Sequence, residues 1–506
     1  MSTVTVIGLD LGTTGARAVL TDVCGATKAV YEAPYDLHTP RPGWAEQSPQ
    51  VWEAATYEAV AAVASAAERP DDVRAIGLTG QMHGLTLLDD EQRPLRDAIL
   101  WCDLRTGPQR RALEDYVGVP TLIRHTGNLP LEGFQAPKLA WVRAHEPRLL
   151  ERTAHVLLPK DYIRLRLSGE CWTDVSDASG TGYFDSATRR WSEAMLKILE
   201  IDRTWLPEVR ESPHTAGRLT PAAAERLGLR AGIPIAAGAG DQPAGAVAAG
   251  VVIEGDAAIT IGSSGVVFAA SSAYGAAPDG RVQVGAHALP QRWYLMGVTQ
   301  AAGLSLRWLR DTLLPDATFA ELVGEAEQST PGSRGLLWLP YLQGERTPHL
   351  DVDARGALVG LTTAHGRADV VRAVLEGVAF SLRDAALAIE RVGASMNRFK
   401  LAGGGARGPL WRQIVADVFE APMRVEAEGR GPAFGAALLG AVAAGLFASV
   451  EEAVQETAMP FASVTPNAAG SAALAAAYAR YRDLYPALAE ANQAAAAAQA
   501  AGSSAT

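Results

Sequence analysis

The stretch DLGTTG, Asp10 to Gly15, joins an apolar run from Val4 to a second one that begins at Ala16, so we expect a strand, a glycine turn and a strand. The glycines allow a phosphate to approach the backbone, and Thr13 and Thr14 offer hydroxyl and N–H donors. A carboxylate beside a phosphate is repelled unless a divalent cation lies between them. Asp10 is therefore a candidate Mg²⁺-side residue, acting through bound water. An ordinary hairpin turn with an edge aspartate is the alternative.

A similar pattern returns in the second half, where GSSG, Gly262 to Gly265, separates the expected strands 257–261 and 266–269. Two copies of strand, turn and strand indicate two related halves, each supplying one turn to a shared site, although so short a match also arises by chance. A third glycine-rich stretch, GGGARG at Gly403 to Gly408, lies between a short strand and a helix. It suits a nucleotide's phosphate or base, or is a plain loop. Neither GxxxxGK[ST] nor GxGxxG opening a βαβ unit is present, so the phosphate site predicted here belongs to another architecture.

Polar residues also follow the expected strand 73–78, in TGQMHG at Thr79 to Gly84. Gln81 and His83 can hydrogen-bond a polyhydroxylated ligand, although a single histidine is more often structural. Asp103 and Arg105 follow the next expected strand, 98–101. They either extend this polar pocket or pair with each other.

One carboxylate interrupts an almost uncharged region, in GAGDQPAG at Gly238 to Gly245. A carboxylate in apolar surroundings is costly unless it is paired, binds a metal or does chemistry. Asp241 is therefore the first candidate for a catalytic residue.

The composition limits the remaining classes of function. The chain has 506 residues, a net charge of -11 and three cysteines, Cys24, Cys102 and Cys171, without any CxxC pattern. This balance gives no reason to expect binding to nucleic acid or to an anionic membrane, and a reducing cytoplasm fits the cysteines best. Residues 431–450 carry no charge but are only weakly hydrophobic, so we expect a buried helix there rather than a membrane span.

In this order, the motifs DLGTTG, TGQMHG, LPKDYIRLRLSGE, GAGDQPAG, GERTPH and GGGAR resemble the FGGY family of carbohydrate kinases, over residues 6 to about 485. The resemblance implies an α/β fold of two ribonuclease-H-like domains, of the actin and sugar-kinase type, with a cleft between them. We expect an N-terminal domain at 1–245, a C-terminal nucleotide-binding domain at 246–485, and an alanine-rich tail at 486–506. We expect the tail to be a frayed helix or disordered.

The resemblance also implies an activity, the ATP-dependent phosphorylation of D-xylulose to D-xylulose 5-phosphate in D-xylose catabolism. Asp241 looks like the catalytic base and Asp10 like the carboxylate near Mg²⁺ and the phosphates. The expected sugar-binding residues are Gln81, Met82, His83, Asp103 and Gln242. The expected ATP-binding residues are Thr13, Thr14, Gly262, Ser263, Ser264, Gly403, Gly404 and Gly405. The partners are then a ketose and MgATP, with no nucleic acid and no membrane, and a homodimer is the candidate assembly.

Two residues beside the proposed sugar site depart from the pattern of the family members that phosphorylate xylulose, which commonly carry asparagine where this chain has Gln242 and Cys102. Sugar preference can shift while the chemistry stays, so a kinase for ribulose, arabinitol or a related substrate is the alternative within the class. A catalytically silent sugar-binding regulator is the alternative outside it. The pattern of the GERTPH stretch, Gly344 to His349, predicts no role.

Overall fold

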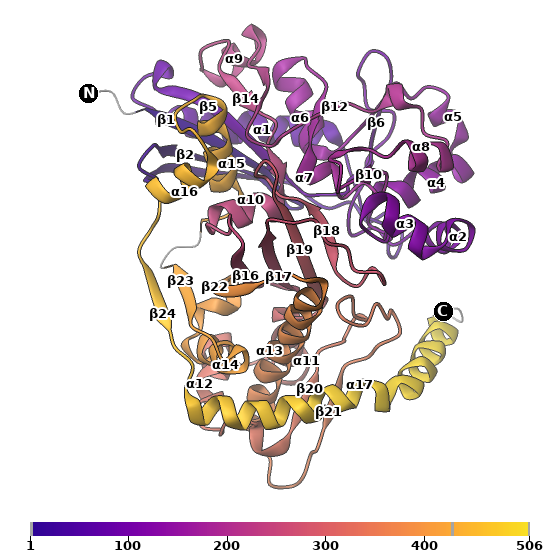
Figure 1. Ribbon diagram of the computed structural model, residues 1–506, viewed down its shortest axis with the longest axis vertical. Coiled ribbons are helices and arrows are strands. Elements are labelled where there is room, and N and C mark those ends of the chain that lie inside the picture. Colours follow the sequence, from indigo (N-terminus) through magenta and orange to yellow (C-terminus); the bar gives the residue numbers. More distant parts are fainter. Residues whose placement is uncertain (1–3, 427–429, 504–506) are drawn as a thin grey trace. The chain divides into compact units, whose positions relative to one another are not determined.

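The computed structural model of this chain describes residues 4–426 and 430–503 (Figure 1). Packing divides these residues into two units. Unit 1 contains residues 1–252, 272–294 and 430–458, and unit 2 contains residues 253–271, 295–429 and 459–506. The predicted boundary at 245/246 remains a proposal. The packing adds two features that the prediction lacked, because residues 272–294 and 430–458 both belong with the N-terminal sequence.

Unit 1 is built on a mixed sheet with the strand order β13-β14-β5-β1-β2-β3, in which β15 also pairs with β5. The strands β1 and β2 enclose the predicted glycine turn and continue into β3 as an antiparallel meander, while β5 runs parallel to β1, β14 and β15. The bounds are β1 Thr5–Leu11, β2 Gly15–Asp22, β3 Thr27–Pro34, β5 Val73–Gly80, β13 Thr215–Arg218, β14 Pro234–Ala236 and β15 Ala239–Gly240.

Helices and short strand pairs surround this sheet. The helices are α1 Pro49–Ala64, α2 Gly107–Val117, α3 Val119–Thr126, α4 Gln135–His145, α5 Pro147–Leu150, α6 Pro159–Ser168, α7 Val175–Ala178, α8 Glu193–Ile198, α9 Pro221–Leu227, α10 Asp241–Ala248, α15 Pro432–Ala443 and α16 Val450–Glu456. The short pairs are β4 Glu46–Gln47 with β7 Ala98–Ile99, β6 Thr86–Leu88 with β8 His155–Leu157, β9 Trp172–Asp174 with β12 Glu208–Arg210, and β10 Phe184–Asp185 with β11 Arg190–Trp191.

Alternate residues of β1 face two different helices, as the period of a strand requires. Ile7, Leu9 and Leu11 share a core with Trp52 of α1, whereas Val6 shares one with Ala433 and other alanines of α15. The helix α15 lies against β1 and β5 although more than 350 residues separate β5 from it (Figure 1).

Glycines permit this close packing. A Cβ added at Gly8 or Gly77 would lie 1.8 or 1.7 Å from a carbonyl oxygen of α15. Nine residues of α15 are buried, which confirms the predicted buried helix within 431–450. Among the described residues, no helix combines the length and the hydropathy needed to cross a bilayer.

Unit 2 contains the second hairpin. The antiparallel strands β16 Gly255–Ile261 and β17 Gly265–Ser271 enclose the GSSG turn, and β16 pairs in parallel with β22 Met396–Ala402. The sheet continues from β22 through β23 Met423–Glu426 to β24 Phe461–Val464, and β19 Trp293–Thr299 neighbours β17. A hairpin whose first strand has a parallel neighbour thus occurs in both units, as the two matching turns predicted.

The helices of unit 2 pack around α13 Arg367–Val392, which is largely buried. The others are α11 Gly303–Leu313, α12 Phe319–Ala326, α14 Pro409–Phe419 and α17 Ala468–Ser503. The small pair β20 Leu337–Leu339 and β21 Ala357–Val359 packs beside α13 and α17. The tail predicted to begin at residue 486 continues α17, and Asn492 and Ala496 are buried, so of the two alternatives, frayed helix or disorder, the helix holds as far as Ser503.

Candidate active site

The register of three strands brings the predicted catalytic carboxylates to one edge of the unit 1 sheet. Leu11 of β1 and Gly240 of β15 both pair with Gly80 of β5. Asp10 immediately precedes the first of these residues, and Asp241 immediately follows the second. Because the carboxyl ends of parallel strands meet at the same edge, this is where ligands bind in open α/β sheets.

The two carboxyl groups influence each other's protonation. Burial, and then the nearby charge of Asp241, raise the pKa of Asp10 to about 7, although Arg17 opposes the shift. Burial also raises the pKa of Asp241 to about 6, while hydrogen bonds from Gln242 work in the other direction. Carboxyl groups with pKa values near neutrality are suited to accept or release a proton at physiological pH.

The atoms around Asp10 leave one acceptor unused. Its Oδ1 is buried and has no hydrogen-bond partner among the described residues. Carboxylate oxygens are the donors that Mg²⁺ prefers, and a cation would compensate a buried negative charge. The arrangement therefore fits a divalent cation near Asp10, held directly or through water.

The DLGTTG turn is fastened by residues that the sequence did not single out. Gly12 N–H donates to Gly15 O, and the Tyr35 hydroxyl donates to Gly12 O at 2.6 Å. The Gln47 amide donates to Thr13 O at 2.7 Å, and the Trp101 indole donates to the Thr13 hydroxyl at 3.0 Å. Thr14 is exposed. Three segments outside the turn thus fix it, while the exposed Thr14 stays accessible to a phosphate.

The predicted sugar-binding residues fall into two groups. Met82 lies against Gly240, where an added Cβ would be 2.7 Å from its Cγ, and Gln242 follows Asp241 on the first turn of α10. His83 has a positive φ of 67°, stacks on Phe134 and hydrogen-bonds through Nδ1 to Gly180 O at 2.6 Å. Met82 and Gln242 thus lie beside Asp241, and His83 follows Met82 after the end of β5.

Asp103 and the amide nitrogen of Gln81 have partners within the protein, whereas the buried Gln81 Oε1 has none among the described residues. Gln81 is 1% exposed, and its amide donates to Gln47 Oε1 at 3.1 Å, so it braces the turn from below. Asp103 is 0% exposed and pairs with Arg105 at 2.7 Å while also accepting the Ala45 N–H. The position of Asp103 fits the ion-pair alternative that the sequence left open.

Lys138 of α4 is a buried cation that sequence reasoning missed. Its ammonium group donates to His83 O at 2.8 Å, and burial lowers the pKa of Lys138 to about 7 although Asp103 and Cys102 oppose the shift. It thereby holds the backbone of His83 in its unusual conformation. The only signal in the sequence is that Lys138 directly precedes an apolar stretch of the helix, LAWV at residues 139–142.

In unit 2, the two glycine-rich stretches lie side by side. A Cβ at Gly403 would be 2.5 Å from Ile261 O, and one at Gly405 would be 2.4 Å from the Ile261 side chain, so the second stretch packs on the last residue before the GSSG turn. Ser263 O accepts the N–H groups of Ala302 and Leu304 at 2.9 and 3.1 Å. Ser263, Gly403 and Gly404 are exposed, and nothing lies within 4 Å of a Cβ placed at Gly404.

Family comparisons agree with this geometry. Residues 5–248 match the N-terminal domain and residues 257–444 the C-terminal domain of the FGGY family of carbohydrate kinases. This chain belongs to the FGGY family. FGGY kinases are phosphotransferases with an alcohol group as acceptor, and the chain has their two-domain α/β sugar-kinase fold.

Among curated FGGY relatives, a xylulose kinase of Escherichia coli is 42% identical over 87% of this chain and 90% of its own length. One of Bacillus subtilis is 37% identical over 95% of this chain and 96% of its own length. A crystal structure described as a xyloylose kinase from Brucella ovis is 39% identical, with a TM-score of 0.90, and covers 96% of this chain and 99% of its own.

Proposed function

We propose that this protein transfers the γ-phosphoryl group of ATP to D-xylulose and produces D-xylulose 5-phosphate and ADP, the reaction that would serve D-xylose catabolism. The observation that carries the proposal is the pairing of β1 and β15 with β5, which brings Asp10 and Asp241 to one sheet edge beside Met82 and His83. The names of the curated relatives agree with xylulose as the acceptor.

Asp241 acts as the general base. A sugar hydroxyl is a poor nucleophile, and a carboxylate that takes its proton as the O–P bond forms contributes about 10²- to 10⁴-fold in rate. Asp241 lies at the start of α10, where the helix N–H groups favour a negative charge. The proton leaves the C5 hydroxyl for Asp241 while the bond between the γ-phosphorus and the bridging oxygen of ADP breaks.

The turn residues bind the phosphates. Thr13 and Thr14 offer donors from unit 1, and Gly262, Ser263, Ser264 and Gly403 to Gly405 offer backbone and hydroxyl groups from unit 2. Mg²⁺, held near Asp10, supplies neutralisation of phosphate charge when bound. The remaining catalysis is placement of the reactants.

Sugar recognition belongs to Met82, His83 and Gln242. The amide of Gln242 begins one methylene further from the backbone than an asparagine amide, and the Cys102 thiol is a weak hydrogen-bonding group. Acceptor choice is therefore the property to measure first.

The test is release of ADP by the purified protein with D-xylulose, L-xylulose, D-ribulose, L-ribulose, D-arabinitol, xylitol and glycerol. We expect the highest kcat/KM with D-xylulose. A higher value with ribulose or arabinitol would reassign the acceptor, and turnover with none of the seven would favour a catalytically silent regulator.

We also propose that the protein acts in the cytoplasm. The three cysteines are unpaired in the structure, as a reducing compartment would keep them.

A further inference from the structure

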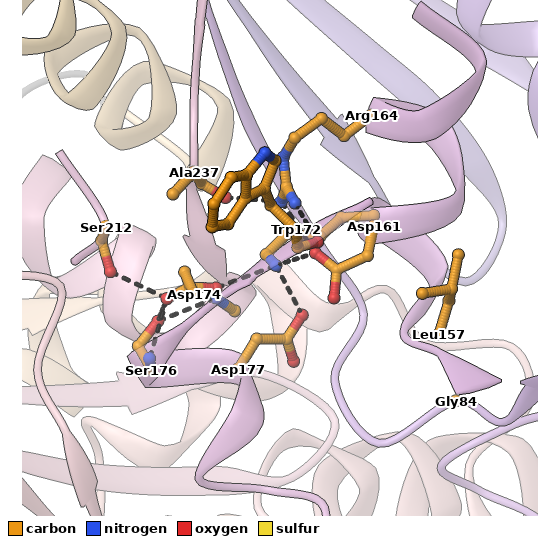
Figure 2. Close-up of polar contacts among 12 residues, drawn as sticks. Gly84, Leu157, Asp161, Arg164, Trp172, Asp174, Ser176, Asp177, Ser212 and Ala237 are labelled. Carbon is orange, nitrogen blue, oxygen red and sulfur yellow. Dashed lines mark hydrogen bonds and ion pairs between the residues drawn. The ribbon is translucent and has the colours of Figure 1, made fainter. Parts of the chain in front are cut away.

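Five charged side chains form a buried group beside the site, and the proposed chemistry leaves them without a task (Figure 2). This group, the charge cluster, consists of Lys160, Asp161, Arg164, Asp174 and Asp177, each at most 1% exposed. The Lys160 ammonium group lies 2.6 Å from Asp161 and 2.8 Å from Asp174, and Arg164 lies 2.7 Å from Asp161. Lys160 thus joins two aspartates that are 13 residues apart.

The positive and negative charges of the cluster are equal in number if one of its three aspartates is protonated. Burial raises the pKa of Asp177 well above its ordinary value, and the neighbouring Asp161 and Asp174 add to the shift, although Lys160 opposes it. Asp177 Oδ2 is also the most distant of the three carboxylate contacts of Lys160, at 3.3 Å. Protonated Asp177 leaves two cations and two carboxylates, as burial away from water requires.

The cluster is hydrogen-bonded to both ends of residues 237–240, the segment that leads to Asp241, at one end directly and at the other through Ser176. At one end, Arg164 Nη2 donates to Ala237 O at 2.6 Å. At the other end, the Ser176 hydroxyl donates to Asp174 Oδ2 at 2.6 Å and accepts the N–H of Gly240 at 3.2 Å. Figure 2 shows Arg164 next to Ala237 and Ser176 next to Asp174, in different parts of the cluster.

Ser176 lies in a part of the chain that also touches the sugar site. Asp174 caps α7 by accepting the Ser176 N–H at 2.7 Å, and a second serine, Ser212, donates to the same oxygen at 2.8 Å. A few residues later, Gly180 O contacts the ring of His83. One short segment therefore connects the cluster with the backbone in front of the base and with a sugar-binding residue.

We propose that the charge cluster positions Asp241 for proton transfer, and that it acts through the hydrogen bond between Ser176 and the Gly240 N–H. Ser176 is then a positioning residue for phosphoryl transfer, a role that rests on Asp241 being the base. A shift of about 1 Å in a reacting group can cost on the order of 10²-fold in rate.

The test compares two serines of the same segment. Ser176→Ala removes the acceptor of the Gly240 N–H, whereas Ser179→Ala removes the acceptor of the Ala286 N–H, at 3.0 Å, which does not lead to Asp241. Both serines are at most 2% exposed, so the losses of stability should be similar. We expect kcat with D-xylulose to fall at least tenfold in Ser176→Ala and less than twofold in Ser179→Ala, with the KM for ATP within twofold in both.

Two more variants keep the test open if Ser176→Ala fails to fold. Ser176→Thr retains the hydroxyl and should keep kcat within threefold of the parent protein. Ser176→Cys fills the same space with a weaker hydrogen-bonding group and should lower kcat at least threefold. Equal losses of kcat in Ser176→Ala and Ser179→Ala, or a Ser176→Cys variant with unchanged kcat, would overturn the positioning role.

The variant Asp241→Asn, measured in the same assay, distinguishes failure of the base assignment from failure of the positioning role. If Asp241→Asn is inactive while Ser176→Ala is fully active, only the inference fails. If Asp241→Asn is active, the base assignment fails first.

Discussion

Asp241 is the first residue of α10, and its position after β15 follows from the pairing of Gly240 with Gly80. The same register places Asp10 beside Thr79 of β5. Asp10 and Asp241 are 231 positions apart in the sequence, so parallel strand pairing determines which carboxylates meet at this edge of the sheet.

Replacement of Asp241 by asparagine keeps the size of the side chain and removes the base. We expect kcat for D-xylulose to fall by about 10²- to 10⁴-fold, because a neutral amide cannot take the hydroxyl proton. ATP binding, measured by calorimetry, should stay within a few-fold, and the melting temperature should not decrease. Turnover near the parent rate would show that another group accepts the proton.

The raised pKa of Asp241 predicts the acid limb of the rate profile. The base must be ionised to act, and burial raises its pKa to about 6. We therefore expect kcat/KM for D-xylulose to rise about tenfold per pH unit below pH 6 and to level off above it. A profile that is still flat at pH 5, recorded with saturating MgATP, would contradict this value.

Glu345 explains the GERTPH stretch as a structural element. Its Oε2 accepts the Thr299 hydroxyl at 2.6 Å and its Oε1 accepts the Gln300 and Arg346 N–H groups, so it ties this loop to the end of β19. Burial raises the pKa of Glu345 to about 8 although these hydrogen bonds oppose the shift. The raised pKa favours the protonated form of Glu345 near neutral pH, and its hydrogen bonds hold the loop against the end of β19 within unit 2.

This shift makes stability depend on pH in a defined direction. The folded state keeps the proton of Glu345 up to about pH 8, whereas the unfolded chain releases it near pH 4.5. The contribution of this proton to the free energy of unfolding is therefore fully present below pH 4.5 and is lost as the pH rises through 8. Glu345→Gln mimics the neutral acid. Between pH 5 and 8, we expect its melting temperature to fall less than that of the parent protein, by about 5 °C. Parallel curves for the two proteins would contradict the assignment.

At the scale of elements, the contact between α15 and the sheet leaves no room for a larger side chain in place of glycine. An added methyl group at Gly77 would lie 1.7 Å from Ala436 O, and backbone atoms on both sides cannot move aside independently. Gly77→Ala should therefore lower the free energy of unfolding by about 2 kcal/mol or more, measured by denaturant titration. Gly107→Ala is the matched control, because its methyl group would meet only a flexible arginine end at 3.7 Å. Equal stability of the two variants would show that α15 can shift away from the sheet.

Local patterns predicted the strands on either side of both glycine turns and the helix within 431–450, because strand periodicity and turn chemistry act over a few residues. They did not reveal Gln47, Tyr35 and Trp101 as supports of the first turn, since these come from three distant segments. They equally missed Ser176, an ordinary serine until Gly240 lies beside it. The uncharged run at 431–450 predicted a buried helix correctly, but no local signal names the sheet that the helix covers.

At the scale of the whole molecule, the chain passes between its two units more than once, because residues 272–294 and 430–458 return to unit 1. A fragment that ends at residue 252 therefore lacks α15 and leaves the alanine-lined face of β1 and β5 uncovered. We expect this fragment to bind a hydrophobic dye and to unfold without a cooperative transition, as followed by circular dichroism. Cooperative unfolding of the 1–252 fragment would show that α15 is dispensable for the sheet.

The late arrival of α15 also matters while the chain is being made. At about 5–20 residues per second, roughly 20 to 70 s pass between synthesis of β5 and synthesis of α15. Throughout this interval the apolar face of β1 and β5 is uncovered, because α15 has not yet been synthesised. The core of this sheet is therefore completed only after the last quarter of the sequence has been synthesised, and until then its apolar face is available to a chaperone.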